Sequence, residues 1–278
     1  MIHLDDAELR RLQETELEIL IEIDRICRKN NIKYSLTGGT LLGAVRHNGF
    51  IPWDDDADIS MLREEYRKFQ KACCTDLDKE RFYFQDMETT EGYRWGYGKV
   101  RRKNTVFLRE HQEDMPYEQG MFVDVFPRDG IPDGVIMGQI HRFLCYVLRK
   151  LMWSAVGKKT ASGVLCRMWY QWMYWICSRE KILLFYQKLI RWSNHSPTKL
   201  VRALTFPLPN GVEGYERDWY RDYIDIEFDG YVFQAEAGYR KWLAREFGDY
   251  MKLPPPEKRK THPVTQIQFP VDDRSDEE

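Results

Sequence analysis

The first thirty residues have the pattern of an amphipathic helix. Leu9, Leu12, Leu20 and Ile23 recur at helical spacing on one face, and Asp5 or Asp6 can cap the start. Over residues 32–61 the spacing of apolar residues changes twice, and it predicts three elements around a glycine pair. These are a strand over 32–36 ended by Gly38-Gly39, one or two helical turns over 40–46, and a strand over 57–61.

Helical and strand patterns alternate along most of the remaining chain. They predict a helix over 63–74, a strand over 81–87, two strands joined at Lys103-Asn104, an apolar strand over 120–127 and a helix over 237–247. Asp229-Gly230 between 223–228 and 231–233 is a strong hairpin signal. We therefore expect an α+β fold with a mixed sheet core, flanking helices and a helical insertion. The expected parts are a core over 1–132, a helical subdomain over 133–200, a C-terminal part completing the core over 201–265, and a disordered acidic tail over 266–278.

The stretch 133–195 differs from the rest in charge and in aromatic content. It holds ten Lys or Arg against two acids, a net charge of +8, and five of the nine tryptophans. Its apolar spacing predicts two or three helices, broken near Gly157 and Gly163. Two interpretations remain open. The aromatic residues form the core of a helical subdomain, or they form a basic surface for peripheral contact with anionic lipid or a lipid-linked acceptor.

Composition limits the class of protein. The 278 residues are 43% hydrophobic and carry a net charge of -2, so no overall charge favours nucleic acid, and no nucleic-acid motif is present. The six cysteines form no C-x-x-C pair. The charged start of the chain does not resemble a signal peptide, and no apolar run is long enough to span a membrane. These features predict a cytoplasmic protein, in contact with the inner membrane face if the basic helices dock there.

Candidate chemistry lies in the carboxylates. Because side chains alternate along a strand, Asp56 and Asp58 share one face, and such a pair suits a divalent cation such as Mg²⁺ or Mn²⁺. Asp124 interrupts an apolar strand, where a shared metal or an arginine could be its partner; we favour the metal. Lys99 and Arg101 also share a strand face, either as ordinary surface residues or as cations for a phosphate.

The acidic run over 54–58 has two simpler interpretations. It could be a solvated turn, since most such runs are. It could also be a calcium loop, because Asp54, Asp56, Asp58 and Glu65 occupy positions 1, 3, 5 and 12 of the EF-hand pattern. The glycine required at position 6 is replaced by Ile59, and a proline interrupts the entering helix, so the pattern argues against a calcium loop.

Three segments together resemble the LicD family of phosphocholine transferases. They are G-G-T-L-L-G-A-V-R-H-N-G-F-I-P-W-D-D-D-A-D-I, F-V-D-V-F-P-R-D-G-I-P and F-G-D-Y-M-K-L-P-P, and the resemblance covers most of 30–130 and 223–262. It implies a nucleotidyltransferase-like core with a glycine turn and three acids. The implied reaction moves phosphocholine from CDP-choline to a hydroxyl of a cell-surface glycan such as teichoic acid or lipopolysaccharide; related members move other phospho-alcohols, including ribitol phosphate. The chain departs from the family pattern at two positions. Ala57 stands where the family usually has a larger aliphatic residue. Pro263 follows His262 where a second histidine is common, which argues against a role for His262 in binding metal or substrate.

The expected mechanism assigns a role to each candidate residue. Asp56 and Asp58 would bind two Mg²⁺ ions, and Asp124 would bind one of them and act as general base. Phosphate oxygens would be held by Gly38, Gly39 and Thr40, and developing charge would be neutralised by Arg46, Lys99 or Arg101. The alternatives are a true nucleotidyltransferase that releases pyrophosphate, and a non-catalytic module that binds a phosphoglycan or calcium.

Overall fold

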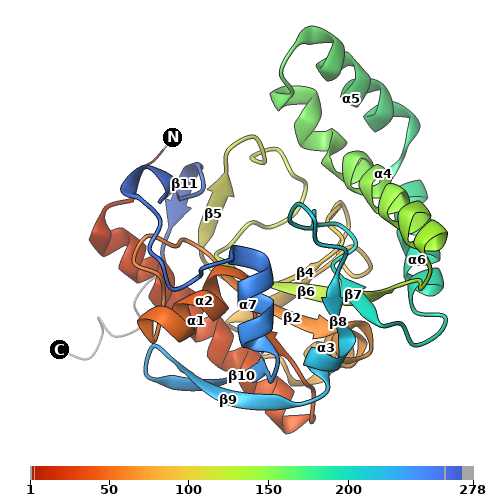
Figure 1. Ribbon diagram of the computed structural model, residues 1–278. Coiled ribbons are helices and arrows are strands. Elements are labelled where there is room, and N and C mark those ends of the chain that lie inside the picture. The colour runs from red at the N-terminus through yellow and green to blue at the C-terminus, as the bar shows by residue number, and fades with distance from the viewer. Residues whose placement is uncertain (1, 3, 260, 271–278) are drawn as a thin grey trace.

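The computed structural model describes residues 2, 4–259 and 261–270 (Figure 1). The first helix begins as predicted, because the Asp5 side chain accepts a hydrogen bond from the Glu8 N–H and Glu8 accepts one from the Asp5 N–H. The helices are α1 (Asp6–Lys29), α2 (Gly38–His47), α3 (Arg63–Asp76), α4 (Val135–Thr160), α5 (Val164–Ile176), α6 (Arg179–Ser193) and α7 (Tyr239–Phe247), with 3-10 turns at Arg217–Tyr220 and Pro256–Lys258.

The central sheet is mixed. The strands are β1 (Ser35–Leu36), β2 (Ala57–Leu62), β3 (Phe82–Gln85), β4 (Gly98–Arg102), β5 (Val106–Arg109), β6 (Phe122–Ile131), β7 (Leu200–Arg202), β8 (Tyr215–Glu216), β9 (Tyr223–Phe228), β10 (Tyr231–Glu236) and β11 (Val264–Gln268). The order in the central sheet is β1-β2-β6-β4-β3, β7 pairs with the end of β6, and β8 pairs with β7. Only β2 and β6 are parallel among the described neighbours in this sheet. The predicted α+β class is confirmed.

The period-two alternation gives the sheet two different faces. Ala57, Ile59, Val123 and Val125 are fully buried in the main core, which also contains the apolar face of α1. Helices α1 and α3 pack against this sheet. Asp58 and Asp124 alternate with those apolar residues and therefore lie on the other face. The hydrophobic core thus fixes the direction in which both carboxylates point.

The glycine pair behaves differently from the prediction. Gly38 and Gly39 are the first residues of α2, and Thr37 is the residue before the helix. Gly38 has a φ of +61°, a conformation that strains any residue with a Cβ. The pair therefore makes the sharp turn from β1 into a helix N-terminus, rather than a loop that precedes the helix.

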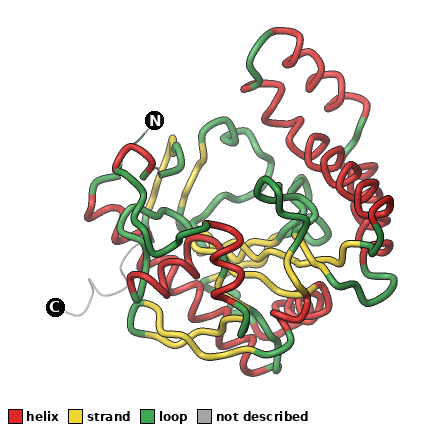
Figure 2. Tube along the Cα trace, viewed as in Figure 1, coloured by secondary structure: helices red, strands yellow, loops and turns green. Residues whose placement is uncertain are grey.

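The helical insertion is a hairpin of α4 and α5 followed by α6 (Figures 1 and 2). The predicted break near Gly157 is wrong, because this residue lies within α4, where a Cβ would approach the Tyr170 ring of α5 to 2.8 Å. Close helix packing explains this glycine. Gly163 precedes α5 with a φ of +86°, so this predicted break is confirmed.

Elements from the last third of the chain return to the core. The predicted hairpin of β9 and β10 turns at Asp229-Gly230, where both residues have positive φ. Strand β11 pairs with β5, which therefore belongs to a different sheet from β4. The predicted tail of 266–278 overlaps β11 as far as Gln268, and 271–278 lie outside the described residues.

Candidate active site

Three charged side chains form a row across the middle of the sheet. Asp58 of β2 is in register with Asp124 of β6, which is in register with Lys99 of β4. The Lys99 ammonium donates to Asp124 Oδ1, and both side chains are buried. Burial lowers the pKa of Lys99 to about 7, against the opposing effect of Asp124. Asp124 therefore has a cation partner from the protein itself, and this partner is Lys99 rather than the arginine that the sequence offered as the alternative to a metal.

Asp58 lies at the centre of a group of carboxylates. Loss of solvent, followed by the charges of Asp56, Asp124 and Asp54, raises its pKa well above the ordinary value. Its backbone N–H donates to Thr40 Oγ1 at 2.8 Å, which joins the strand to the first turn of α2. Repulsion among these acids is the electrostatic signature of a site that favours a cation.

The loop before β2 adds Asp54 to this group. Its carboxylate packs against Gly39, so that a Cβ at this position would collide with Asp54 Oδ2. Burial, together with Asp56 and Asp55, raises the pKa of Asp54 to about 8. The amide of Gln13 on α1 holds the loop by donating to the carbonyl of Asp54 at 3.0 Å.

Asp55 and Asp56 have partners from distant parts of the chain. Asp55 is buried and accepts from the backbone N–H of His262 at 2.7 Å, and its Oδ1 lies 2.9 Å from Nδ1 of that histidine. Asp56 Oδ2 lies 3.1 Å from Arg109 and 3.6 Å from His262 Nδ1. The structure thus brings His262 to the acids, although the following proline had argued against a role for it.

Glu16 of α1 is a further buried carboxylate beside the acidic loop. It is 1% exposed, and its Oε2 has no hydrogen-bond partner in the described part of the chain. Burial, followed by the charges of Asp56, Asp55, Asp54 and Asp58, raises its pKa well above the ordinary value. A buried acid that interacts electrostatically with four others is costly unless it is protonated or shares a cation.

These carboxylates fit a divalent cation. One ligand atom each of Asp55, Asp56 and His262 lies within 4.8 Å of the others. Oxygen donors from carboxylates suit Mg²⁺ and Mn²⁺, and the buried Glu16 oxygen beside them has no hydrogen-bond partner among the described residues. The acids form no calcium loop, because Ala57–Leu62 is a strand.

The remaining predicted residues divide into two groups. Gly38 lies beside the acids, since a Cβ there would approach Asp58 Oδ2 to 2.7 Å, and Thr40 is buried next to it. Arg46 lies at the far end of α2, where it donates to the carbonyl of Tyr250 at 2.9 Å. Arg101 donates to Gln85 and to the carbonyl of Gly120. The structure does not bring either arginine to the acids.

Two other arginines, which were not predicted from the sequence, lie beside the acids. Arg109, at the end of β5, contacts Asp56. Arg128 of β6 donates to Thr37 Oγ1 at 2.9 Å, and no described residue accepts from its Nε. A signal for Arg128 was present, because it lies four residues after Asp124 and so on the same strand face. Arg109 had no such signal, since its strand belongs to another sheet.

A cavity of about 190 Å³ opens beside Asp58 and the start of α2. Arg128, Tyr215 of β8 and two residues of α7, Trp242 and Glu246, form part of its wall. Phe126, Phe206, Pro207 and Leu208 add apolar surface. The helix N-terminus, an arginine and the acids thus meet at one small cavity.

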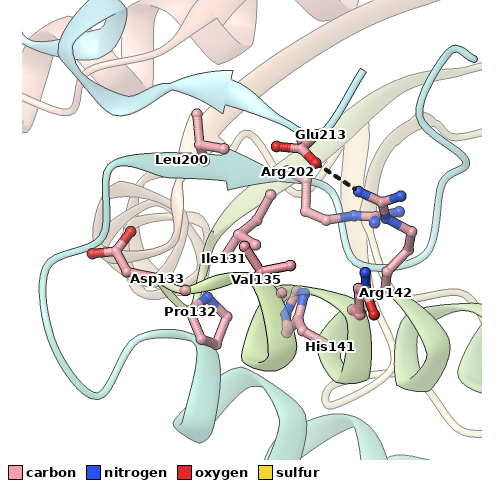
Figure 3. A pocket seen from close by; sticks show the side chains of 12 residues that line it. Ile131, Pro132, Asp133, Val135, His141, Arg142, Leu200, Arg202 and Glu213 are labelled. Carbon is pink, nitrogen blue, oxygen red and sulfur yellow. Dashed lines mark ion pairs between the residues drawn. The ribbon is translucent and has the colours of Figure 1, made fainter. Parts of the chain in front are cut away.

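A second cavity, of about 280 Å³, lies where β6 ends and α4 begins (Figure 3). Asp133 and His141 face it, and Arg142 and Glu213 form an ion pair at 3.6 Å across it. Ile131, at its edge, is seven residues beyond Asp124, or about 23 Å along an extended strand. This cavity is therefore not part of the candidate active site.

The chain is similar to known proteins along most of its length. The family model described as LicD/FKTN/FKRP, nucleotidyltransferase domain, matches residues 31–132. Lipopolysaccharide cholinephosphotransferase LicD of Haemophilus influenzae is 30% identical over 267 residues, which are 92% of this chain and 96% of that protein. Ribitol 5-phosphate transferase FKRP of Mus musculus is 39% identical over 57 residues, which are 20% of this chain and 11% of that protein.

The mixed sheet, the acidic cluster and these similarities define a transferase of phosphorus-containing groups. The chain belongs to the LicD family. None of the helices in the described residues combines the length and the apolar character needed to cross a bilayer.

Proposed function

We propose that this protein transfers phosphocholine, or a closely related phospho-alcohol, from a CDP-alcohol to a hydroxyl of a cell-surface glycan. The observation that carries the proposal is the cluster of Asp56, Asp58 and Asp124 beside the N-terminus of α2. A helix N-terminus attracts phosphate, while the acids attract cations that neutralise a diphosphate. The relative that matches nearly the whole chain is named for transfer of cholinephosphate to lipopolysaccharide.

Asp56, Asp58 and Asp124 are the proposed ligands of two Mg²⁺ or Mn²⁺ ions, with Asp55 and His262 beside them. Such ions, when bound, would neutralise the diphosphate and stabilise the attacking and departing oxygens. Asp124 must share its carboxylate with Lys99, which uses Oδ1. Asp54 and Glu16 add negative charge around the same volume.

The transfer step uses residues of the row across the sheet. Asp124 accepts the proton of the acceptor hydroxyl, whose oxygen forms a bond to the phosphorus distal to cytidine. The bond from that phosphorus to the bridging oxygen breaks, and its electron pair leaves with CMP. Lys99, with a pKa near 7 and in contact with Asp124, can take up the proton or stabilise the carboxylate. Arg109 and Arg128 are placed to balance negative charge on the donor.

An assay of CMP release tests this function. Purified protein is incubated with CDP-choline, Mg²⁺ and an acceptor glycan, and Asp124→Asn and Asp58→Asn are compared with wild type. Both variants are expected to lose at least about 100-fold in rate with unchanged circular dichroism. Near wild-type turnover in either variant, or turnover unaffected by EDTA, would contradict the assignment.

We also propose that the insertion contacts an anionic membrane surface that carries the acceptor. Of the described residues of α5, Met173 alone is buried, while large apolar side chains are exposed along it. The most exposed are Leu165 at 82%, Trp175 at 80% and Val164 at 64%. The surrounding net charge of +8 over 133–195 complements anionic headgroups, and tryptophan is typical of the interface. Helices α4 and α6 form a core together, but the α5 aromatics are not part of it.

Sedimentation with vesicles tests the membrane contact. Wild type is expected to bind vesicles of phosphatidylcholine with 30% phosphatidylglycerol more than vesicles of phosphatidylcholine alone. Replacing Trp172 and Trp175 with Glu should reduce binding at least about tenfold. A matched double change to Glu at Tyr231 and Val232, exposed on the hairpin of β9 and β10, should have little effect. Equal binding by both double variants would refute the proposal.

A further inference from the structure

We propose that the cavity beside Asp58 binds the phosphocholine end of the donor, with Glu246 as partner of the quaternary ammonium and Arg128 as partner of the phosphate. The inference rests on the proposed function and names the alcohol that the site prefers. It predicts selection of a cationic alcohol over a neutral polyol such as ribitol or glycerol.

The size and position of the cavity favour one end of the donor. Its volume of about 190 Å³ is below the roughly 300–1,000 Å³ of pockets that enclose a drug-sized ligand. It is lined by Gly38 and Asp58, so a group bound in it lies next to the acids and the helix N-terminus. The transferred group must reach those residues, whereas the cytidine can lie outside.

Arg128 supplies a free donor for an anion. Its side chain is 8% exposed, and its Nε has no acceptor in the described residues, although one terminal nitrogen donates to Thr37. An unpaired buried donor costs free energy that a ligand oxygen can recover. Because Arg128 borders both the cavity and the turn into α2, a phosphate that it binds lies close to Gly38.

The opposite charge comes from α7. Trp242 and Glu246 are one turn apart on the helix, and the Tyr215 hydroxyl donates to the Glu246 carboxylate. The Tyr215 and Trp242 rings lie 5.5 Å apart at 31°. Aromatic faces combined with a carboxylate recognise a quaternary ammonium, which has no N–H to donate.

The charges and the walls together discriminate between alcohols. The Arg128 guanidinium already lies near both rings, 5.4 Å from the Tyr215 centroid and 5.8 Å from the Trp242 centroid. It would repel a cation there, so Glu246 must supply the attraction. A zwitterion satisfies both charges at once. The apolar walls contributed by Phe126 and Phe206 suit methyl groups, whereas the hydroxyls of a polyol would lose hydrogen bonds to water.

Donor kinetics of Glu246→Gln test the inference. The amide can still accept from Tyr215, so the variant is expected to fold. Its kcat/KM for CDP-choline should fall about 10- to 100-fold, while CDP-ribitol and CDP-glycerol should change less than about threefold. Glu216→Gln is the matched control, because this carboxylate neighbours Tyr215 but pairs with Arg245 outside the cavity. It should leave all donors unchanged.

Each other result overturns the inference. Equal losses with every donor would place the shared cytidine or diphosphate in the cavity, and no loss with any donor would remove the cavity from donor binding. If wild type prefers CDP-ribitol, the proposed transfer stands and the cavity assignment fails.

Calorimetry with phosphocholine alone separates the two proposals, because it requires no turnover. Wild type should bind phosphocholine at least about tenfold more tightly than glycerol 3-phosphate, and Glu246→Gln should lose this difference. Equal binding of the two ligands by wild type would refute the inference even if CMP is released. Absence of CMP release with all donors would instead refute the proposed function.

Discussion

Replacing Asp58 with Asn should stabilise the protein in the absence of a divalent cation while abolishing transfer. Burial, followed by the charges of Asp56, Asp124 and Asp54 around it, raises the pKa of Asp58. Two unit charges at about 6 Å repel by about 3 kcal/mol at an effective dielectric constant of 20. Lys99 offsets part of this repulsion. A net gain of about 1–3 kcal/mol, or roughly 2–5 °C in Tm for a chain of this length, follows for the isosteric amide.

The assay is thermal and urea unfolding at pH 8 in EDTA and in Mg²⁺. In Mg²⁺ the order should reverse, because a ligand at about 1,000 times its Kd stabilises the native protein by about 4.1 kcal/mol and the variant lacks one of the residues that bind the ion. Ser60→Ala, on the same strand face as Asp58 but two residues further along β2, is the control and should show no Mg²⁺ dependence beyond that of wild type. If Asp58→Asn is less stable than wild type in EDTA, the repulsive cation site is refuted.

Three further predictions concern other parts of the fold. Arg63→Met should cost about 3–5 kcal/mol in urea unfolding, because it leaves Asp129, now bound at 2.6 and 2.7 Å, buried without its ion pair. Glu236→Gln should raise the free energy of unfolding by at most about 3 kcal/mol at pH 8 and by little at pH 4. Burial raises the pKa of Glu236 from 4.5 to about 7, so the stability of the wild type falls as pH rises from 4.5 to 7. A series of unfolding curves over this pH range checks the prediction. Gly39→Ala should lower CMP release at least about tenfold, because the new Cβ collides with the Asp54 carboxylate, and unchanged activity would contradict this geometry.

The sheet and two of its acids could be predicted because local patterns determine them. Alternation placed Asp58 on the strand face opposite Ala57 and Ile59, and a single carboxylate in an apolar strand identified Asp124. The same argument was wrong for Asp56, which lies in the loop one residue before β2 begins at Ala57. The hairpin at Asp229-Gly230 followed from the positive φ values that its turn requires. These signals involve neighbours in sequence and need no knowledge of tertiary contacts.

Long-range partners could not be predicted in the same way. His262 reaches Asp55 across more than 200 residues, and Arg109 reaches Asp56 from a strand of another sheet. The sequence contains a signal for Glu16, because this residue interrupts the apolar face of α1 between Leu12 and Leu20. Only packing showed that this face points toward the acids. The helix break predicted near Gly157 was wrong, because glycine is favoured both at a helix break and where two helices pack closely.

The most direct test of the central claim follows each phosphorus of the donor. CDP-choline labelled in the phosphate next to choline, or in the phosphate next to cytidine, is incubated with the protein, Mg²⁺ and an acceptor glycan. The account predicts that the first label moves to the glycan and that the second remains in CMP. Transfer of the second label, or release of pyrophosphate from a nucleoside triphosphate in place of CMP, would contradict it.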